Sequence, residues 1–293
     1  MGDGKLKSEA AELDAFIAAL ESAREVKDIA GWRSGFTALD ASLNGLARGL
    51  YLVVGAPAAG KTAFVKQLCD QAARLNSVPA VFFTLGERKK DLSLRTLARL
   101  SGLETHEIRR GAGYLLHAYG VSKQNVAQEE MAPGWEKLKA AAAGAKSWLD
   151  RLYVIEGDAR TTLEDIERNI SAAREAANTQ SLLFVIDDAQ RLGAAATALD
   201  ERLPLVVERL SELALRLDLP LLATWPELGS AGAPEHWAER AVGADAVLVL
   251  REDQTIPETV ARGVTLHIVK NRVGDKTKIA FDFTPGLAKF SER

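Results

Sequence analysis

The sequence predicts an α/β fold whose mainly parallel central sheet is covered by helices on both faces. From residue 50 onward, apolar runs of strand length alternate with amphipathic stretches of helix length. Repeated strand–helix units of this kind build parallel sheets, because each helix carries the chain back to the edge where the next strand begins. In the final third, three apolar runs follow one another without long helices between them. We therefore expect antiparallel strands at the C-terminal end of the sheet.

The first element that we expect is an amphipathic helix over residues 5–28. Four apolar residues have the i, i+3, i+4, i+7 spacing that places side chains on one helical face, namely Leu13, Phe16, Ile17 and Leu20. Gly31 follows this helix, so we divide the chain into an N-terminal arm, residues 1–30, and a main domain, residues 31–293. The arm either folds back on its own domain or docks on a neighbouring subunit, and its pattern does not distinguish the two.

In the main domain, a turn-rich segment around a short apolar helix fills residues 29–49 before the strand–helix units begin. One helix has a clear start signal, since Thr161 or Thr162 suits an N-cap before Glu164 and Asp165. The strands are expected at residues 50–54, 80–85, 152–155, 182–186, 219–224, 246–250, 264–269 and 278–283, and the helices at 62–75, 90–100, 162–177 and 199–217.

Residues 104–150 interrupt this rhythm. The stretch combines turn residues such as Gly111, Gly113 and Pro133 with an alanine-rich patch at 140–145, and alanine is a strong helix former. Its charges are mixed, so it does not read as a basic tail. We expect a small helical lobe inserted around residues 104–150.

Composition restricts the class of protein. The chain has 293 residues, of which 47% are hydrophobic and 26% are charged, and its formal net charge is −3. This balance is ordinary for a soluble globular chain and provides no global basic field that would attract nucleic acid. The single cysteine, Cys69, excludes an internal disulfide and a cysteine-cluster metal site. No apolar run is long enough to span a membrane, and we expect a cytoplasmic protein.

The most specific motif lies between the first strand and the helix that follows it. The sequence GAPAAGKT matches the pattern G-x-x-x-x-G-K-[ST], in which backbone N–H groups surround phosphate oxygens at a helix N-terminus. Lys61 would meet the terminal phosphates, and the Thr62 hydroxyl would be a ligand to Mg²⁺. A plain glycine turn is the alternative, but a complete octapeptide in this context favours nucleoside triphosphate binding. The residues concerned are Gly55, Ala56, Pro57, Ala58, Ala59, Gly60, Lys61 and Thr62.

A second motif places an acid beside this loop. The apolar run 183–186 ends in Asp187, and ligands of open α/β sheets bind at the carboxyl ends of the strands. We expect Asp187 to hold Mg²⁺. Asp188 would point the opposite way if the strand continued, because side chains alternate along a strand. Its alternative role is that of a polar turn residue.

Besides the phosphate loop, six further segments follow one another in the chain, namely SGFTALD (34–40), VFFTLGE (81–87), FVIDDAQRL (184–192), LPLLATW (219–225), GADAVLVLRED (243–253) and IVKNRVGDKTKIAFDF (268–283). Their ordered succession resembles the motor domain of DnaB-type replicative helicases, of the RecA-like superfamily. The resemblance covers roughly residues 30–290 and implies a RecA-like ATPase that uses ATP and Mg²⁺, assembles into a hexameric ring or helical oligomer and acts on single-stranded nucleic acid. It also implies that residues 5–28 are a linker-type helix that docks on the next subunit.

The resemblance implies catalytic residues as well. The family's catalytic glutamate falls at Gly86 when the segments are aligned without a gap, and Glu87 follows it. Because glycine lets the chain turn, we expect Glu87 to return to the site and activate the attacking water, the alternative being a surface carboxylate. Lys270 and Arg272 match the Lys-x-Arg element that reaches the γ-phosphate of the neighbouring subunit, the alternative being an exposed basic strand edge. Arg251 matches a position near the nucleotide base, where its plane would stack.

Two departures from the family pattern bear on function. Where the family places a polar glutamine after strand 219–224, this chain has Trp225 and Pro226, and an indole does not offer the same donor and acceptor. The loop at 193–198 has no lysine or arginine, although phosphate contacts supply most nonspecific DNA affinity. The alternative function is therefore a helicase-derived ATPase that switches with nucleotide as a scaffold or regulator of protein partners. A small-molecule phosphoryl transferase is a third option, against which the paired cations argue.

Overall fold

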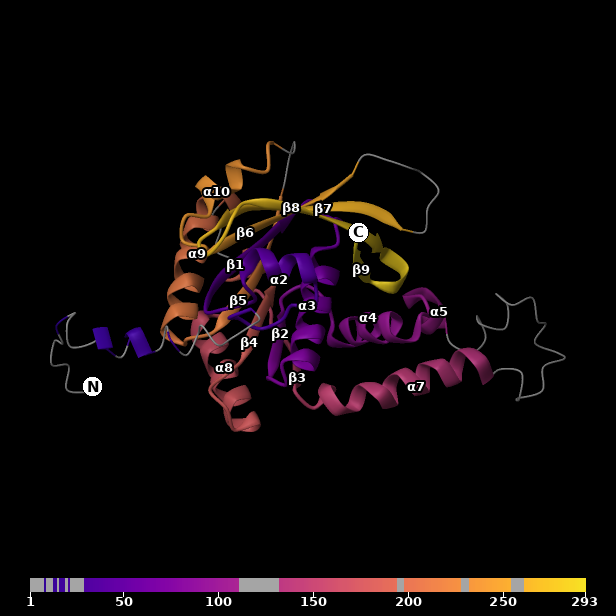
Figure 1. Cartoon of the computed structure of the whole chain (residues 1–293). Helices are drawn as coiled ribbons and strands as arrows, with labels where there is room; N and C mark the ends of the chain where they lie inside the picture. The colour runs from indigo at the N-terminus through magenta and orange to yellow at the C-terminus, as the bar shows by residue number, and fades with distance from the viewer. Residues whose placement is uncertain are drawn as a thin grey trace.

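The computed structural model describes residues 29–110, 132–193, 198–227, 232–253 and 261–293, with positions 8, 13–14, 16–18 and 21 of the N-terminal arm. A nine-stranded mixed sheet forms its centre (Figure 1), with six parallel strands followed by three antiparallel ones, as predicted. The strand order is β3 (Leu152–Glu156), β2 (Ala80–Thr84), β4 (Leu183–Asp187), β5 (Pro220–Pro226), β1 (Gly49–Gly55), β6 (Ala246–Glu252), β7 (Arg262–Asn271), β8 (Thr277–Thr284) and β9 (Lys289–Glu292).

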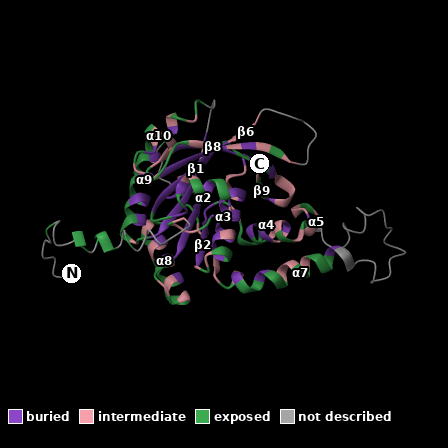
Figure 2. Ribbon diagram, in the orientation of Figure 1, coloured by how far each residue is buried: buried purple, intermediate pink, exposed green. Residues whose placement is uncertain are grey.

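Two hydrophobic cores form because alternate side chains of each strand point to opposite faces. In β1, Tyr51 and Val53 pack in one core, while Leu50, Leu52 and Val54 pack in the other. The first core is covered by α2 (Thr37–Leu43), α3 (Lys61–Leu75), α4 (Lys89–Ser101) and α7 (Ala132–Leu149), and the second by α8 (Leu163–Ala177), α9 (Leu199–Arg216) and α10 (His236–Arg240). Figure 2 shows the buried strands between helices whose outer faces are exposed.

Most predicted elements lie within a few residues of their expected places. Thr162 is the N-cap of α8, where it forms a capping box with Asp165. Strand β5 extends through Trp225 to Pro226, two residues beyond its expected end, and Trp225 is buried in the core. The sequence analysis missed α10 and β9. Each has at most five residues and buries one large side chain, Trp237 or Phe290, so neither shows a periodic pattern.

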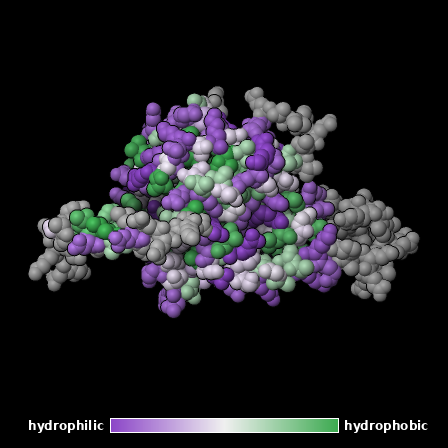
Figure 3. All heavy atoms as spheres, in the orientation of Figure 1, coloured by the Kyte–Doolittle hydropathy of each residue, from purple (hydrophilic) through white to green (hydrophobic). Residues whose placement is uncertain are grey.

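The arm and the expected insertion are described only in part. Leu13, Phe16 and Ile17 are helical and between 45% and 59% exposed. Figure 3 shows hydrophobic atoms, in green, on the described part of the arm at the left. Residues 111–131 of the expected insertion lie outside the described residues. Its described parts are α5 (Thr105–Arg110) and α7, whose Ala145 and Trp148 are buried in the first core. Within the described part of the chain, no helix has the length and apolar character needed to cross a membrane.

Candidate active site

The phosphate loop follows the central strand β1 and leads directly into α3. Ala58 has φ 65° and Gly60 has φ 91°, so the loop curls through two left-handed positions before the helix begins at Lys61. A Cβ on Gly60 would lie 2.9 Å from the Phe290 ring and 3.0 Å from the Phe283 ring. Glycine is therefore required there both by the backbone and by the close approach of the C-terminal strands.

Lys61 folds back over this loop. Its Nζ donates hydrogen bonds to the carbonyls of Gly55 and Ala56, each at 2.9 Å. Burial lowers the pKa of Lys61, and the negative charges of Asp188, Asp187 and, more weakly, Glu227 oppose this shift. The ammonium thus lies at the loop among acidic side chains. Anionic phosphate oxygens would replace the two carbonyls as its hydrogen-bond partners.

Asp187 ends β4 beside the first turn of α3, as the sequence predicts. Its Oδ2 lies 3.0 Å from the Thr62 hydroxyl, and its Oδ1 accepts a hydrogen bond from Thr224 of β5 at 2.8 Å. Burial and the neighbouring Asp188 raise the pKa of Asp187 to about 6, although the hydroxyls of Thr224 and Thr62 oppose the shift. The paired hydroxyl and carboxylate are the hard oxygen donors that Mg²⁺ prefers, so these residues fit the expected metal.

A cleft of about 450 Å³ opens beside the loop. The loop contributes part of its lining, and the C-terminal part of the chain contributes Arg262, Phe283 and Pro285. Three further side chains reach it from the ends of β2 and β4 and from α4, namely Glu87, Asp188 and Arg95. The cleft therefore lies at the carboxyl ends of the parallel strands, where the fold class places ligands.

Glu87 reaches the cleft but is paired with Arg95. The guanidinium contacts both carboxylate oxygens, with Nη2 2.5 Å from Oε1 and Nε 3.1 Å from Oε2. The glycine before it has a different role from the turn that the sequence suggested. Gly86 has no left-handed backbone, yet a Cβ there would overlap Oδ2 of Asp188 and lie 3.1 Å from its Cγ. Gly86 is therefore explained by the approach of Asp188.

Arg251 lies one residue beyond Leu250, which pairs with Gly55 at the start of the phosphate loop. Its guanidinium donates to the buried carboxylate of Glu227 at 2.7 Å and to the carbonyl of Gly232 at 2.9 Å. The same Glu227 oxygen accepts a hydrogen bond from the Trp237 indole at 2.9 Å. Arg251 is thus close to the loop, and its guanidinium is already paired with a buried acid. To stack on a nucleotide base, the guanidinium would do so from this paired position or would give up these partners.

Lys270 and Arg272 lie at the other end of the sheet from the phosphate loop. Lys270 pairs with Val247 near the start of β6, and its Nζ donates to the Val242 carbonyl. Arg272 forms an ion pair with Asp245 at 2.8 Å. Strand β7 lies between β6 and β8, although its residues past Ile268 pair only with β6. The structure does not bring these two cations to the phosphate loop of their own chain.

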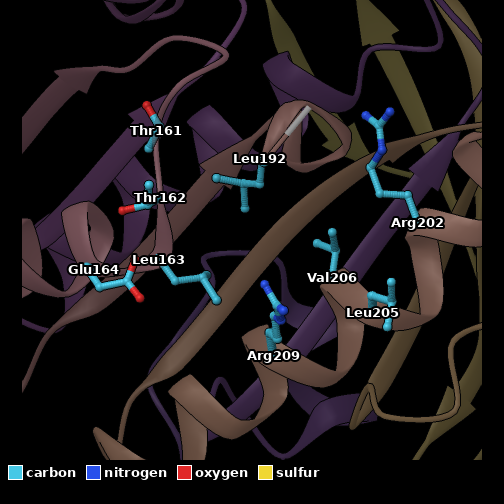
Figure 4. A pocket seen from close by; sticks show the side chains of 10 residues that line it. Thr161, Thr162, Leu163, Glu164, Leu192, Arg202, Leu205, Val206 and Arg209 are labelled. Carbon is cyan, nitrogen blue, oxygen red and sulfur yellow. The ribbon is translucent and has the colours of Figure 1, made fainter. Parts of the chain in front are cut away.

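A second cavity, of about 410 Å³, lies between the start of α8 and the face of α9 (Figure 4). Its lining mixes aliphatic side chains such as Leu163 and Leu205 with the hydroxyls of Thr161 and Thr162. It lacks the phosphate loop and the paired acids, so we place the active site in the other cleft. The loop that would contact nucleic acid by resemblance runs on from here, and its residues 194–197 lie outside the described chain.

Sequence reasoning missed several residues that line the cleft or, like Glu227, contact the loop beside it. The sequence places Asp188 on the opposite side only if the strand continues, with a polar turn residue as the alternative; β4 ends at Asp187, and Asp188 has φ 63°. Glu227 directly follows β5, the neighbour of β1, so an acid at the end of a buried strand was its available signal. No sequence signal identifies Arg95 or Arg262, because the approach of these side chains to the cleft depends on how α4 and β7 pack.

Comparisons with known proteins identify the family and the fold of this chain. The family model of the DnaB-like helicase C-terminal domain matches residues 31–225. The replicative DNA helicases DnaB of Pasteurella multocida and Haemophilus influenzae are 28% and 26% identical over 198 residues, which are 67% of this chain and 38% of each relative. A solved ATPase domain aligns with TM-score 0.78 at 19% identity, covering 98% of this chain and all of that one. A DnaB-like replicative helicase, whose structure concerns its interactions with primase, aligns with TM-score 0.74 at 19% identity over 94% of this chain and 67% of its own.

Proposed function

This chain belongs to the DnaB-like helicase C-terminal domain family, and from that membership we propose that it is an oligomeric ATPase with a RecA-like motor fold. It spans about two fifths of the length of the curated relatives it matches. The activity proposed is ATP hydrolysis in the cleft beside the phosphate loop, completed by cations of a neighbouring subunit.

Each residue of the cleft has a distinct part in this activity. The backbone N–H groups of the loop and the Lys61 ammonium would bind the phosphates. Thr62 and Asp187 would hold Mg²⁺, which when bound neutralises charge on the phosphate oxygens. Lys270 and Arg272 would approach the terminal phosphate from the next copy and stabilise charge that develops during transfer.

The placement of Arg272 carries this proposal. Its partner Asp245 also accepts a hydrogen bond from the backbone of Leu50, at 2.9 Å, near the start of β1. The phosphate loop begins at Gly55, five residues further along the strand, which is roughly 16 Å at about 3.3 Å per residue. Within one chain, Arg272 and the phosphate loop are thus separated by the length of strand β1. A site that combines the two therefore requires a second copy of the chain.

Assembly and turnover should therefore rise together with protein concentration. Sedimentation velocity with a non-hydrolysable ATP analogue measures the oligomer, and the specific ATPase activity is followed over the same concentrations. A monomer with full specific activity at high dilution would overturn the shared site. The exposed Leu13, Phe16 and Ile17 suggest the contact, since a linker-type helix would bury them on the neighbour.

We propose single-stranded nucleic acid as the polymer on which the oligomer moves. A scaffold or regulator of protein partners is the second candidate, favoured by the burial of Trp225 at 2% exposure, which leaves no polar sensor at that position of β5. Binding of labelled single-stranded DNA at increasing salt separates the two. A motor that neutralises several phosphates should lose affinity steeply with salt, whereas weak binding without a slope, with ATP-dependent assembly retained, would favour the scaffold.

A further inference from the structure

The acid that follows Asp187 occupies a defined place in the cleft. Because β4 ends at Asp187, Asp188 takes a left-handed conformation with φ 63° and its side chain lines the cleft. Its N–H donates to the Thr224 hydroxyl at 2.8 Å, and the same hydroxyl donates to Asp187 at 2.8 Å. One side chain of β5 thus orients both consecutive acids.

The Asp188 carboxylate packs directly against Gly86. Strands β2 and β4 pair with Thr84 opposite Asp187, so the residues that follow each strand lie side by side. Any Cβ on Gly86 would overlap the Asp188 carboxylate. A side chain at position 86 and the observed position of Asp188 therefore exclude each other. The carboxylate of Asp188 fills the space into which a residue at position 86 would point.

Glu87 and Asp188 are the two acids among the described residues that line the cleft, and their hydrogen-bond partners differ. Both oxygens of Glu87 are held by the Arg95 guanidinium, so a water molecule would have to compete with this bidentate pair for the carboxylate. Oδ1 of Asp188 accepts a hydrogen bond from Gln190 at 3.0 Å. In the described chain, the nearest cation to its Oδ2 is Nε of Arg191 at 3.7 Å, beyond hydrogen-bond length.

Asp188 also lines the same cleft as the phosphate-binding lysine, Lys61. Its negative charge acts on Lys61 more strongly than those of Asp187 and Glu227. Its side chain is 27% exposed, so water reaches it. A carboxylate with one oxygen that accepts no hydrogen bond from the described residues, in the cleft of the phosphate-binding lysine and accessible to water, is placed to act as a general base.

We infer that Asp188, and not Glu87, orients the attacking water, and that the Gly86–Asp188 pair moves the catalytic carboxylate from the end of β2 to the end of β4. The inference rests on the proposed ATP hydrolysis. Water oxygen forms a bond to the γ-phosphorus, the bond from that phosphorus to the bridging oxygen breaks, and ADP leaves with the electron pair. Oδ2 of Asp188 accepts the proton of the water and releases it to solvent or to the product phosphate.

The test compares Asp188→Asn with Glu87→Gln in the full chain. We expect Asp188→Asn to lower kcat by about 100-fold or more, in line with general base catalysis, while the Kd for ATP stays within about threefold. Glu87→Gln should change kcat much less. Asp218→Asn is the matched control, because Asp218 is 79% exposed and precedes β5 at the opposite end of the sheet. Thermal unfolding verifies that each variant is folded.

A second experiment moves the carboxylate from position 188 to position 86 and measures a gain of activity, which misfolding of a variant would not produce. Gly86→Glu alone should displace the Asp188 carboxylate, whose Oδ2 its Cβ would overlap, and Asp188→Ala alone should lose turnover. The double variant, Gly86→Glu with Asp188→Ala, should be more active than Asp188→Ala, since a carboxylate again occupies the same space. Full activity of Asp188→Asn, with Glu87→Gln inactive, would overturn the inference and leave the ATPase proposal intact. Binding of ATP without turnover in the wild type would instead overturn the proposed hydrolysis itself.

Discussion

Arg272 forms an ion pair with Asp245 at 2.8 Å, at the end of the sheet opposite the phosphate loop. The Arg272 side chain is 57% exposed, whereas that of Asp245 is 14% exposed and also accepts a hydrogen bond from the Leu50 backbone at 2.9 Å. The guanidinium is therefore the solvent-accessible member of the pair. If it exchanges Asp245 for a phosphate of a neighbouring copy, Asp245 keeps the Leu50 N–H as a partner.

The first prediction concerns this arginine. Arg272→Ala should bind ATP normally and hydrolyse it at least about tenfold more slowly, because the lost cation acts on charge that develops at the interface. Mixing Arg272→Ala with Lys61→Ala should restore part of the activity, since some interfaces then combine an intact loop with an intact Arg272. Steady-state ATPase assays at a fixed total protein concentration measure both effects.

Lys276→Ala is the control for that experiment, because Lys276 is an exposed cation in the turn after β7. It should retain wild-type turnover. Equal activity of the mixture and of the separate variants, in assemblies shown to exchange subunits, would contradict a site shared between copies.

The second prediction concerns the phosphate loop itself. Lys61→Ala should lower ATP affinity by more than about tenfold, because the ammonium that lies over the loop is the cation placed for the phosphates. Titration calorimetry with ATP and Mg²⁺ measures the Kd. Lys137→Ala, an exposed change on α7, should bind like the wild type. Unchanged ATP affinity in Lys61→Ala would contradict the assignment of this loop as the phosphate-binding site.

The loop and Asp187 were predictable from sequence because both depend on short local patterns. The octapeptide contains its own glycines, its lysine and the start of α3, and Asp187 directly follows a buried run. The parallel sheet with added antiparallel strands was predictable for the same reason, from the alternation of strand and helix patterns.

Contacts between separate elements were not predictable. The Gly86–Asp188 pair depends on the register of β2 against β4, and Thr224 reaches both acids only because β5 adjoins β4. The pairing of Glu87 with Arg95 depends on how α4 packs after the turn. The sequence pattern predicts each strand but not which strands are neighbours. The contacts of each acid could therefore not be predicted.

The third prediction follows from the burial of Asp187. Burial raises its pKa from 3.8 to about 6 in the folded protein, so the folded state binds a proton more tightly than the unfolded state. This contribution to stability is complete below the unfolded pKa and is lost as pH rises through about 6. The free energy of unfolding of the nucleotide-free wild type should thus fall, relative to Asp187→Asn, by up to about 3 kcal/mol between pH 4 and pH 7.

Urea denaturation of both proteins across that pH range measures the difference, because asparagine at position 187 does not titrate. Asp40→Asn is a less suitable reference, since Asp40 accepts a hydrogen bond from the Ser34 backbone. Asp150→Asn, at the turn before β3, serves as the control. A constant difference between wild type and Asp187→Asn from pH 4 to pH 7 would show that the carboxylate is as readily ionised in the folded protein as in the unfolded chain.

The fourth prediction concerns a buried ion network between α3 and α4. Asp70 of α3 pairs with Lys66 on the same helix and with Arg99 of α4, at 2.5 Å, and each of the three side chains is at most 8% exposed. Thr96 donates to Asp70 at 2.7 Å and accepts from Lys66 at 2.7 Å. Removal of one member of a buried network leaves the others without countercharge and costs about 3–5 kcal/mol.

Asp70→Asn should therefore lower the free energy of unfolding by about that amount, since two buried cations lose their shared carboxylate. Asp91→Asn provides the contrast, because Asp91 pairs with Arg109 at side-chain exposures of 39% and 61%, and it should change stability by less than about 1 kcal/mol. Chemical denaturation monitored by tryptophan fluorescence measures both. Similar small losses in the two variants would mean that water or a rearranged neighbour compensates Lys66 and Arg99. In that case the packing of α4 on α3 would depend on their apolar contacts alone.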